Sequence, residues 1–402
     1  MRQKPVIAKR NNAKILESEY SAFRKEIIDY FEKNLLDDEP LTILDPMAGT
    51  APLVPLIETR GHKAYFNDIL PLHFFMNQAK TFRAFQYYQH YGYDRFLNEL
   101  LGYMVPLKDK QLYISDKWIE DNILHDLVQS WNATAKCEEL ARIIIRAIIL
   151  LCVRPLSSIT KTKNATWPKF GGISSNKNIA DIVAESLTRL DTYYKKHYEP
   201  LVRKRGECIF LNGNASEIQL PEKVDLIITS PPYCNRFDIL RSYGPENYFL
   251  SAVGYSVQTT DVIGTNNVKD YESLDSDYDY LIHNSESALS LLGEMRKSKI
   301  RDDQTYYLKY YTRYFITLFH VVKRVLNNLS GNGRMYFVTQ DNTHRGQLIE
   351  IDRILEELLD NIGWKSKIVD QWARHHLGLQ NISRDSRVVR PKQFEKLVAV
   401  WQ

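Results

Sequence analysis

The chain has 402 residues, of which 44% are hydrophobic and 25% are charged, with a formal net charge of +4. This hydrophobic content suffices for a packed core, and so small a net charge does not by itself indicate a polyanionic partner. The four cysteines form no Cys-x-x-Cys pair, which argues against a zinc site and favours the reducing cytosol. The longest apolar run, 143–153, contains Arg146 and is too short to cross a bilayer, so we expect no membrane partner.

The small net charge conceals two segments of opposite sign. Residues 154–206 contain 11 Lys and Arg against 4 Asp and Glu, a net of +7. Residues 261–286 contain 7 Asp and Glu against one Lys, a net of −6. The first segment suits a partner that carries phosphate groups, and the second segment should repel such a partner.

The N-terminal elements predict a parallel sheet. Residues 18–33 show helical spacing of apolar side chains, and Leu41–Leu44 reads as a buried strand. A turn of small residues and a helix follow, up to Gly61, and a second strand ends at Asp68. Strand, helix and strand in about 30 residues form a βαβ unit, whose strands run parallel.

The remainder of the chain reads as one long helical insertion and a return to alternating strands and helices. Residues from about 72 to 205 are expected to be mostly helical, with a polar loop at 157–178. The other expected elements are, in chain order, helices in 121–153 and 178–194, strands in 207–215 and 224–230, a helix in 239–254, a helix in 306–329, a strand in 333–342, a helix in 348–363, and a closing antiparallel pair in 365–376 and 395–402.

The first strand runs into the sequence Asp-Pro-Met-Ala-Gly-Thr-Ala, residues 45–51. A doubly wound fold binds its ligand at this strand end, where Asp45 would project and Ala48, Gly49 and Thr50 would let a ligand approach the backbone. The pattern is neither the Gly-x-Gly-x-x-Gly fingerprint nor a P-loop, so a diphosphate is not the indicated ligand. The acid at the end of the second strand, Asp68, is placed to accept hydrogen bonds from a ribose. The alternative is a tight turn with a capping acid.

A later strand ends in Thr-Ser-Pro-Pro-Tyr, residues 229–233. Proline fixes its own φ and has no N–H, and it pushes the residue before it into extended geometry. The chain therefore leaves a buried strand as a stiff turn that offers a hydroxyl, carbonyl oxygens and an aromatic ring. The alternative is a turn that merely ends the strand, with Tyr233 in the core.

These three strand ends together resemble the amino-group DNA methyltransferases, which transfer a methyl group from S-adenosylmethionine to N4 of cytosine or N6 of adenine. The resemblance covers about 18–72, 206–255 and 305–402, and it implies an α/β fold of the Rossmann-like class I methyltransferase type: a mainly parallel sheet with a closing antiparallel pair. It also implies that the cofactor site is built from Phe23, Asp45, Met47, Ala48, Gly49, Thr50, Asp68, Asn214 and Ala215. The family more often has an aromatic at Met47, Gly at Ala51 and Asp at Asn214.

The resemblance implies a catalytic role for Ser230, Pro231, Pro232 and Tyr233. The Ser230 hydroxyl and the Pro231 carbonyl would accept the two N–H groups of a target amine, and Pro232 would stiffen that carbonyl. Tyr233 would stack on a base flipped out of the duplex. Serine as the first residue of the motif favours N4 of cytosine over N6 of adenine. Methylation of an RNA amine remains an alternative, as does a DNA-binding subunit that has lost catalysis.

Contact with double-stranded DNA is expected from basic and aromatic residues near the turn and in two loops. These residues are Arg236, Lys161, Lys163, Trp167, Lys169, Arg384 and Arg387. We expect a catalytic domain of 1–72 and 206–402, which carries an acidic insertion at about 255–300. The mainly helical residues 73–205 form a candidate DNA-recognition region. The family resemblance places the protein in a bacterial or phage-infected cytoplasm, and a cognate restriction endonuclease is a further candidate partner.

Overall fold

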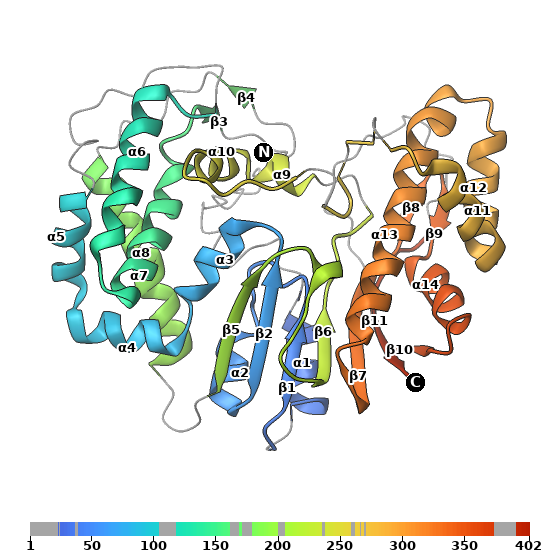
Figure 1. Cartoon of the computed structure of the whole chain (residues 1–402), viewed down its shortest axis with the longest axis horizontal. Helices are drawn as coiled ribbons and strands as arrows, with labels where there is room; N and C mark the ends of the chain where they lie inside the picture. The colour runs from blue at the N-terminus through green and yellow to red at the C-terminus, as the bar shows by residue number, and fades with distance from the viewer. Residues whose placement is uncertain are drawn as a thin grey trace, which may run out of the picture.

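The computed structural model describes residues 23, 25–36, 39–103, 118–160, 169–170, 179–199, 206–234, 238–258, 262–265, 267–268, 271–373 and 391–402. A seven-stranded sheet forms the centre of the molecule, with helices packed around it (Figure 1). Its strands are β1 (Thr42–Asp45), β2 (Lys63–Asp68), β5 (Glu207–Asn212), β6 (Val224–Thr229), β7 (Leu329–Gln340), β10 (Lys365–Ala373) and β11 (Phe394–Trp401).

The strand order is β10-β11-β7-β6-β1-β2-β5. The pairs β5–β2, β2–β1, β1–β6 and β6–β7 are parallel, whereas β11 is antiparallel to both β7 and β10. From β1, the chain adds β2 and β5 on one side, then adds β6 and β7 on the other side of β1. The antiparallel strand β11 lies next to β7, and β10 forms the edge of the sheet. This topology confirms the predicted fold class, a Rossmann-like methyltransferase sheet with a closing antiparallel pair and a helical insertion between β2 and β5.

The helices of the described residues were mostly anticipated, although several bounds differ from the predictions. They are α1 (Lys25–Asn34), α2 (Val54–Arg60), α3 (Pro71–Gln78), α4 (Phe82–Tyr91), α5 (Tyr93–Tyr103), α6 (Asp121–Ala133), α7 (Glu139–Val153), α8 (Ile179–Tyr198), α9 (Ile239–Ser242), α10 (Gly244–Ala252), α11 (Leu274–Asn284), α12 (Glu286–Lys297), α13 (Leu308–Leu326) and α14 (Ile351–Asp360). The helix expected over 239–254 is interrupted at Tyr243, and the polar region 255–300 contains two helices, α11 and α12.

Two small hairpins were not predicted from the sequence. One pairs β3 (Ile159–Thr160) with β4 (Lys169–Phe170), and the other pairs β8 (Asn342–His344) with β9 (Gln347–Ile349). Strands of two or three residues are too short for an alternating pattern to be recognised.

Both faces of the sheet are covered because its strands alternate apolar side chains between them. On β7, Tyr336 and Val338 pack with α1 and α2, whereas Met335 and Phe337 pack with α13 and α14. Figure 1 shows this second group of helices, α11–α14, as a lobe at one end of the sheet. We call it the second lobe.

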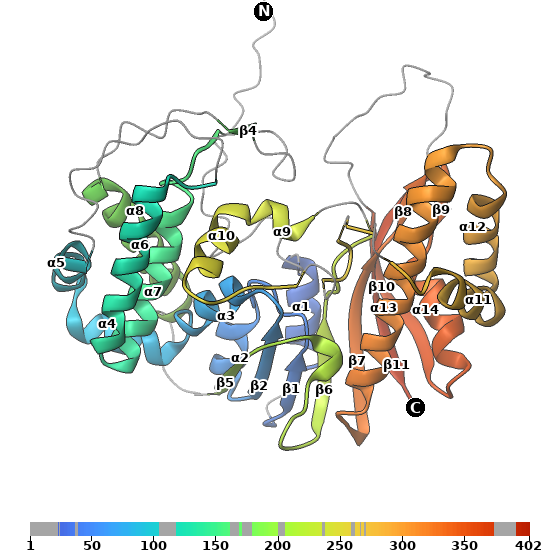
Figure 2. The same ribbon diagram turned by 45° about the horizontal axis from the view of Figure 1, so that its top comes forward.

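A separate apolar core holds the helical insertion together. It includes buried side chains from α3 to α8 and also from α10, which follows the Ser230 turn in the chain. Figure 2 shows α9 and α10 beside α3, above the edge of the sheet. We call α3–α8 with α9 and α10 the insertion lobe.

Buried polar groups fix the insertion lobe to its neighbours. Tyr198 on α8 donates to the Glu58 carboxylate on α2, at 2.6 Å between oxygens. Arg154, after α7, makes two bonds of 2.8 and 2.7 Å to Glu246 on α10, whose side chain is fully buried. Breaking a buried pair of this kind costs about 3–5 kcal/mol, because the remaining charge is left without a partner. The lobe is therefore held in one orientation toward the turn at Ser230.

Candidate active site

The two turns that the sequence singled out lie side by side. Strands β1 and β6 are parallel neighbours, with Leu44 opposite Ile227. The turns that follow Asp45 and Thr229 consequently leave the sheet at the same edge. Ligands of doubly wound folds bind at this edge, where the order of the strands reverses.

Asp45 is a buried carboxylate at the end of β1. Its residue surface is 1% exposed, and one of its oxygens accepts the Met47 N–H at 3.2 Å. Burial raises the pKa of Asp45 to about 8, and the negative charge of Asp68 also raises it. Hydrogen bonding by the Thr229 hydroxyl and the Met47 N–H lowers this pKa, but less than burial raises it. A cationic ligand would relieve this burial penalty, because it favours the ionised carboxylate.

The backbone of the first turn is held by side chains from the following elements. Gly49 N–H donates to Asp68 at 2.7 Å, and the Gly49 carbonyl accepts the Asn77 amide at 2.8 Å. The Lys80 ammonium, itself buried, donates to the Thr50 carbonyl at 2.6 Å. The turn is therefore fixed in shape before any ligand arrives.

The conformation of this turn explains its small residues. Gly49 has φ +52°, and a Cβ added to it would meet no atom within 4 Å, so it faces open space. Ala51 has φ +42° and is also in the left-handed region, which favours glycine. The Ala48 N–H donates to the Asn67 carbonyl at 2.8 Å. A ligand can therefore approach the backbone at Gly49 without displacing a side chain.

Asp68 lies at the end of β2 with 12% of its side chain exposed. Besides Gly49, it accepts the Leu70 N–H at 2.8 Å, and the Nδ1 atom of buried His73 lies 3.1 Å from its second oxygen. These contacts orient the carboxylate, and its exposed part remains accessible to a ligand hydroxyl.

Asn214 and Ala215 lie at the end of β5, next to Asp68. The Asn214 side-chain oxygen accepts the Ser216 N–H at 3.0 Å and caps the short turn Ala215–Glu217. Its amide nitrogen makes no hydrogen bond within the described part of the chain. One end of Asn214 is thus structural, and the other end remains available as a donor.

Phe23 and Met47 lie on different sides of the first turn. Phe23 is 3% exposed, packs edge-on against Phe31 at 5.3 Å between ring centroids, and shares an apolar cluster with Ala48 and Ala51. Met47 is partly buried against the cluster of the second lobe. Phe23 therefore lies in the core behind the turn.

The Ser-Pro-Pro-Tyr turn is held by bonds from distant elements. The Tyr314 hydroxyl, on α13, donates to the Pro232 carbonyl at 2.7 Å. The Tyr233 hydroxyl donates to Glu395 on β11 at 2.6 Å, and Glu395 is only 8% exposed. Both the backbone after the prolines and the tyrosine ring are thereby fixed.

Two acceptors of this turn remain available. The Ser230 hydroxyl oxygen is buried and makes no hydrogen bond to any described residue. Nor does a donor from the described ranges reach the Pro231 carbonyl. Leaving a buried polar group such as the Ser230 hydroxyl unbonded costs about 1–3 kcal/mol, which favours a ligand that donates a hydrogen bond to it. The Pro231 carbonyl offers a second acceptor next to it.

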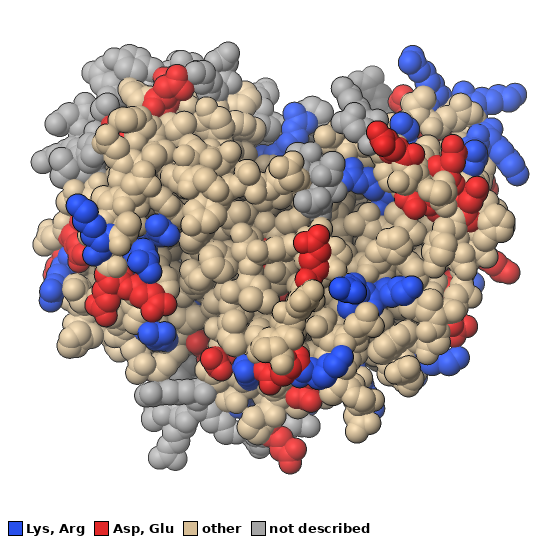
Figure 3. Space-filling view, viewed as in Figure 1, with Lys and Arg blue, Asp and Glu red and all other residues tan. Residues whose placement is uncertain are grey.

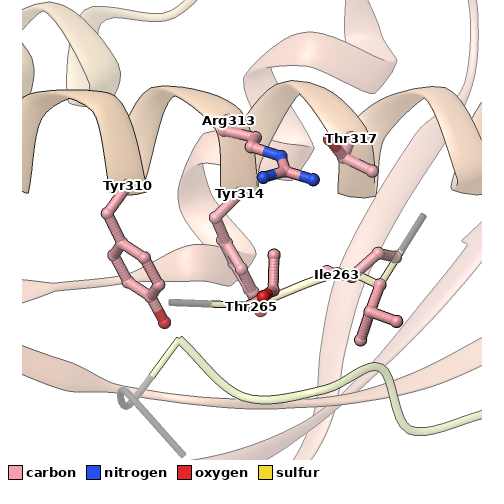
Figure 4. A pocket seen from close by; sticks show the side chains of 8 residues that line it. Ile263, Thr265, Tyr310, Arg313, Tyr314 and Thr317 are labelled. Atoms are coloured by element: carbon pink, nitrogen blue, oxygen red, sulfur yellow. The ribbon is translucent and has the colours of Figure 1, made fainter. Parts of the chain in front are cut away.

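A small pocket borders the turn on the side of α13 (Figure 4). Tyr314 both lines this pocket and bonds the Pro232 carbonyl. The other lining residues are Val262, Ile263, Gly264, Thr265, Tyr310, Arg313 and Thr317. A Cβ added to Gly264 would lie 3.8 Å from Pro232, so residues 262–265 cover the outside of the turn.

Most of the residues predicted to contact DNA fall outside the described part of the chain. These are Lys161, Lys163, Trp167, Arg236, Arg384 and Arg387. Lys169 lies in β4, opposite Thr160 in the β3–β4 hairpin of the insertion lobe. Their role in binding remains a prediction.

The sequence interpretation missed the side chains that support both turns. His73, Asn77 and Lys80 belong to α3 and the residues just after it, which had been assigned to the insertion. Polar residues within an otherwise apolar helix directly after β2 were a usable signal for them. Tyr314 and Glu395 gave no such signal, because a long-range contact cannot be read from one sequence.

The residues around the first turn fit a cationic cofactor such as S-adenosylmethionine. Asp68 bonds the Gly49 N–H next to the open space at Gly49, and the buried Asp45 lies close enough to Asp68 for the two charges to interact. Ionised Asp45 suits an ammonium group, and Asp68 suits the hydroxyls of a ribose. Among the described residues, no group of three or more His, Cys, Asp or Glu is arranged to hold a metal ion, and no helix among them is long and apolar enough to cross a membrane.

No family model matches the chain. Over 192 residues it is 26% identical to the Type II methyltransferase M.AvaI of Nostoc sp. and of Anabaena variabilis, covering 44% of this chain but only 38% of each relative. Type II methyltransferase M.BsoBI of Geobacillus stearothermophilus is 22% identical over 425 aligned positions, covering 92% of this chain and 82% of the relative. Among solved structures, the rRNA methyltransferase aviRa of Streptomyces viridochromogenes aligns with 96% of this chain and 89% of its own chain, at 9% identity and a TM-score of 0.30. The chain thus shows weak sequence similarity to Type II methyltransferases and spans well under half the length of the M.AvaI relatives it matches.

Proposed function

We propose that the protein is an S-adenosylmethionine-dependent DNA methyltransferase that modifies the exocyclic N4 of cytosine in duplex DNA. The observation that carries this proposal is the pair of unbonded acceptors, the Ser230 hydroxyl and the Pro231 carbonyl, beside the turn at Asp45. Two acceptors at one strand end match the two N–H groups of an exocyclic amine. The distant relationship to Type II methyltransferases, a class of DNA-modifying enzymes, supports the same function.

The cofactor would be held by the first turn and the ends of β2 and β5. Asp45 would pair with its ammonium group, Asp68 would accept from its ribose, and the free amide nitrogen of Asn214 would meet its adenine. The cofactor site would also be lined by Met47, Ala48, Gly49, Thr50 and Ala215, and Phe23 would pack behind these residues. Bound in this way, the cofactor supplies an activated methyl group.

The acceptors at Ser230 and Pro231 would prepare the amine for attack. The lone pair of an exocyclic amine is delocalised into its ring, so the nitrogen must become pyramidal before it can form a bond to carbon. Two hydrogen bonds accepted from its N–H groups favour that geometry. The nitrogen would then bond to the methyl carbon as the bond between that carbon and the cofactor sulfur breaks. The methylated nitrogen, cationic and therefore acidic, would release one proton to solvent. Tyr314 keeps the Pro232 carbonyl occupied, which leaves the Pro231 carbonyl as the available acceptor.

Base flipping follows from the depth of the site. Ser230 is 6% exposed, so a base within a duplex cannot reach its hydroxyl. The target nucleotide would have to leave the stack, and the ring of Tyr233 would then provide a surface against which the flipped base packs. Arg236, Lys161, Lys163, Trp167, Lys169, Arg384 and Arg387 are proposed to contact the DNA. A cognate restriction endonuclease and a cytoplasmic location follow from this reading as further predictions.

Nucleoside mass spectrometry tests the proposal. Duplex DNA is incubated with the protein and S-adenosylmethionine, digested, and compared with DNA treated with the Ser230→Ala variant. We expect N4-methylcytosine with the wild type and at least a hundredfold less with the variant. Ser276→Ala, an exposed serine of α11, serves as the matched control and should retain full activity.

Each alternative has its own product. N6-methyladenine would keep the mechanism and overturn the choice of base. Product on RNA alone would overturn the choice of nucleic acid. A wild-type protein that binds S-adenosylmethionine and DNA but forms no product on any substrate would identify a subunit without catalysis.

A further inference from the structure

Four cations lie within six residues at the end of α12, on a part of the chain that the proposed function does not use. They are Arg296, Lys297, Lys299 and Arg301, and all four are exposed. No acidic residue falls within 296–301, but Glu294 precedes this stretch and Asp302 and Asp303 follow it directly. In Figure 3, Lys and Arg side chains gather at the upper corner of the second lobe, over α12 and α13, with acidic side chains beside them.

The loop that carries these cations is ordered by its own hydrogen bonds. The Ser298 hydroxyl donates to Asp303 at 2.7 Å, and it accepts the Ile300 N–H at 3.1 Å. The Gln304 amide donates to the Ser298 carbonyl at 2.8 Å. The side chains between these points therefore project from a defined backbone, which lowers the entropy lost when they bind a partner.

Asp303 also connects this loop to the β8–β9 hairpin. It is 4% exposed, and one of its oxygens lies 3.0 Å from His344 Nε2 and 2.9 Å from Arg345 Nε. Burial by itself would raise the pKa of Asp303, but its bonds from Ser298, Arg345 and His344 outweigh that effect and hold the pKa below its usual value. The loop and the hairpin thus form one unit around an ionised carboxylate.

The position of the hairpin relates this unit to the candidate active site. The hairpin follows β7, and β7 is the parallel neighbour of β6, with Phe337 opposite Thr229. Because parallel strands end at the same edge, the hairpin leaves the sheet next to the Ser230 turn. The cations at the end of α12 therefore lie on the same side of the molecule as the proposed base site.

Three of the cations have no partner in the described structure. Arg296 pairs with Asp275 at 3.2 Å and lies over the ring of Tyr278, but no carboxylate of the described residues reaches Lys297, Lys299 or Arg301. Exposed lysines and arginines are often merely solvated. Here, an ordered loop holds three cations without carboxylate partners on the same side of the molecule as the proposed base site, which favours binding of phosphate groups.

Building on the proposed function, we propose that Lys297, Lys299 and Arg301 form a platform that binds the phosphate backbone of duplex DNA beside the flipped base. The platform would not distinguish one DNA sequence from another, because the phosphate groups are the same at every base pair. It sets how far the duplex lies over the second lobe, and its contribution to affinity depends on salt.

The test is duplex binding across a range of salt concentrations, measured by fluorescence anisotropy with a labelled oligonucleotide. The variant Lys299→Gln/Arg301→Gln is compared with Lys323→Gln/Arg324→Gln. The control pair is also one exposed Lys and one exposed Arg, at the other end of α13, about 28 Å along the helix. Each lost phosphate contact should reduce the slope of log affinity against log salt by about 0.9, and weaken binding about eightfold at 0.1 M salt.

We expect the platform variant to lose up to about 1.8 in slope, and the control variant to match the wild type. Equal slopes for platform variant and wild type, with methylation intact, overturn the platform and leave the proposed function standing. A wild type that binds duplex with the predicted difference between variants but forms no methylated product overturns the proposed function and keeps the platform. A wild type that binds no duplex overturns both.

Discussion

The two turns of the candidate site are supported in different ways. Gly49 and Thr50, in the first turn, are held by side chains that lie 19, 28 and 30 residues further along the chain. Pro232 and Tyr233, in the second turn, are held by side chains 82 and 162 residues away. The first turn therefore depends on one βαβ unit and its next helix, whereas the second turn requires α13 and the last strand of the sheet.

This difference separates two kinds of function within one site. A turn fixed by its immediate neighbours suits the binding of a cofactor, whose shape does not vary. The second turn would receive a base that arrives from outside. It is fixed by β11 of the sheet and by α13 of the second lobe, which also carries the proposed phosphate platform. Changes at the first turn should therefore alter cofactor binding alone, and changes at the supports of the second turn should alter methyl transfer alone.

The largest effect is expected from the charge of Asp45. Because burial raises the pKa of Asp45 to about 8, the carboxyl is mostly protonated at pH 6. A cationic cofactor selects the ionised form, so its affinity should rise about tenfold per pH unit below pH 8 and level off above it. Between pH 6 and pH 8 we expect about a fiftyfold gain, measured by calorimetry with S-adenosylmethionine.

Asp45→Asn should weaken the cofactor by about a hundredfold at pH 9 and abolish this pH dependence, while binding of duplex DNA stays intact. Asp225→Asn is the matched control, because Asp225 accepts the Thr42 N–H at 2.9 Å at the opposite end of the same strands. An affinity of the wild type that does not change between pH 6 and pH 9 would contradict the role given to Asp45.

The sequence predicted the fold and the first turn well for physical reasons. Strand periodicity and turn chemistry are local, so the βαβ unit from Thr42 to Asp68 and the closing pair of strands could be recognised from their own residues. The interruption at Tyr243 was missed although Gly244 and Pro245 mark it, because proline is favoured in the first turn of a new helix. The helices α11 and α12 were missed because their many charged and polar residues were interpreted as a polar region.

The second turn was recognised only as a motif. Its residues could be named because two prolines after a buried strand are unusual, but its supports could not. Tyr314 lies in a helix with apolar side chains on most of one face, where a tyrosine reads as core, and Glu395 opens an apolar strand like any edge residue. Only the packing of α13 and β11 against β6 and β7 brings them to the turn.

An intermediate effect is expected from the bond between Tyr233 and Glu395. Tyr233→Phe keeps the aromatic ring but removes the hydroxyl that bonds Glu395, and Glu395→Gln weakens the same hydrogen bond. Each variant should therefore lower kcat/KM for DNA methylation about tenfold. The double variant should be little worse than either single variant, since both remove one interaction. Affinity for the cofactor should not change.

A second tyrosine–glutamate pair provides the control for this experiment. Tyr65 on β2 donates to Glu222 at 2.7 Å, and Glu222 precedes the start of β6, at the edge of the sheet away from both turns. Tyr65→Phe and Glu222→Gln should therefore leave kcat/KM unchanged. Additive losses in the Tyr233 and Glu395 cycle would mean that the two residues act separately, and the proposed orientation of the ring would be wrong.

The smallest effects are expected from removing single hydrogen bonds to the backbone of each turn, and they should distinguish the functions of the two turns. Asn77→Ala removes the bond to the Gly49 carbonyl, and Tyr314→Phe removes the bond to the Pro232 carbonyl. A neutral hydrogen bond contributes about 1 kcal/mol, or roughly a fivefold change. We expect Asn77→Ala to weaken cofactor binding fivefold with an unchanged rate at saturating cofactor.

Tyr314→Phe should do the reverse, lowering the rate of methyl transfer fivefold with unchanged cofactor affinity. Single-turnover kinetics at saturating cofactor, together with calorimetry, measure both quantities for each variant. If either substitution changed both quantities equally, the two turns would act as one unit. We expect opposite responses because α3 bonds the backbone of the first turn, whereas α13 bonds the backbone of the second turn.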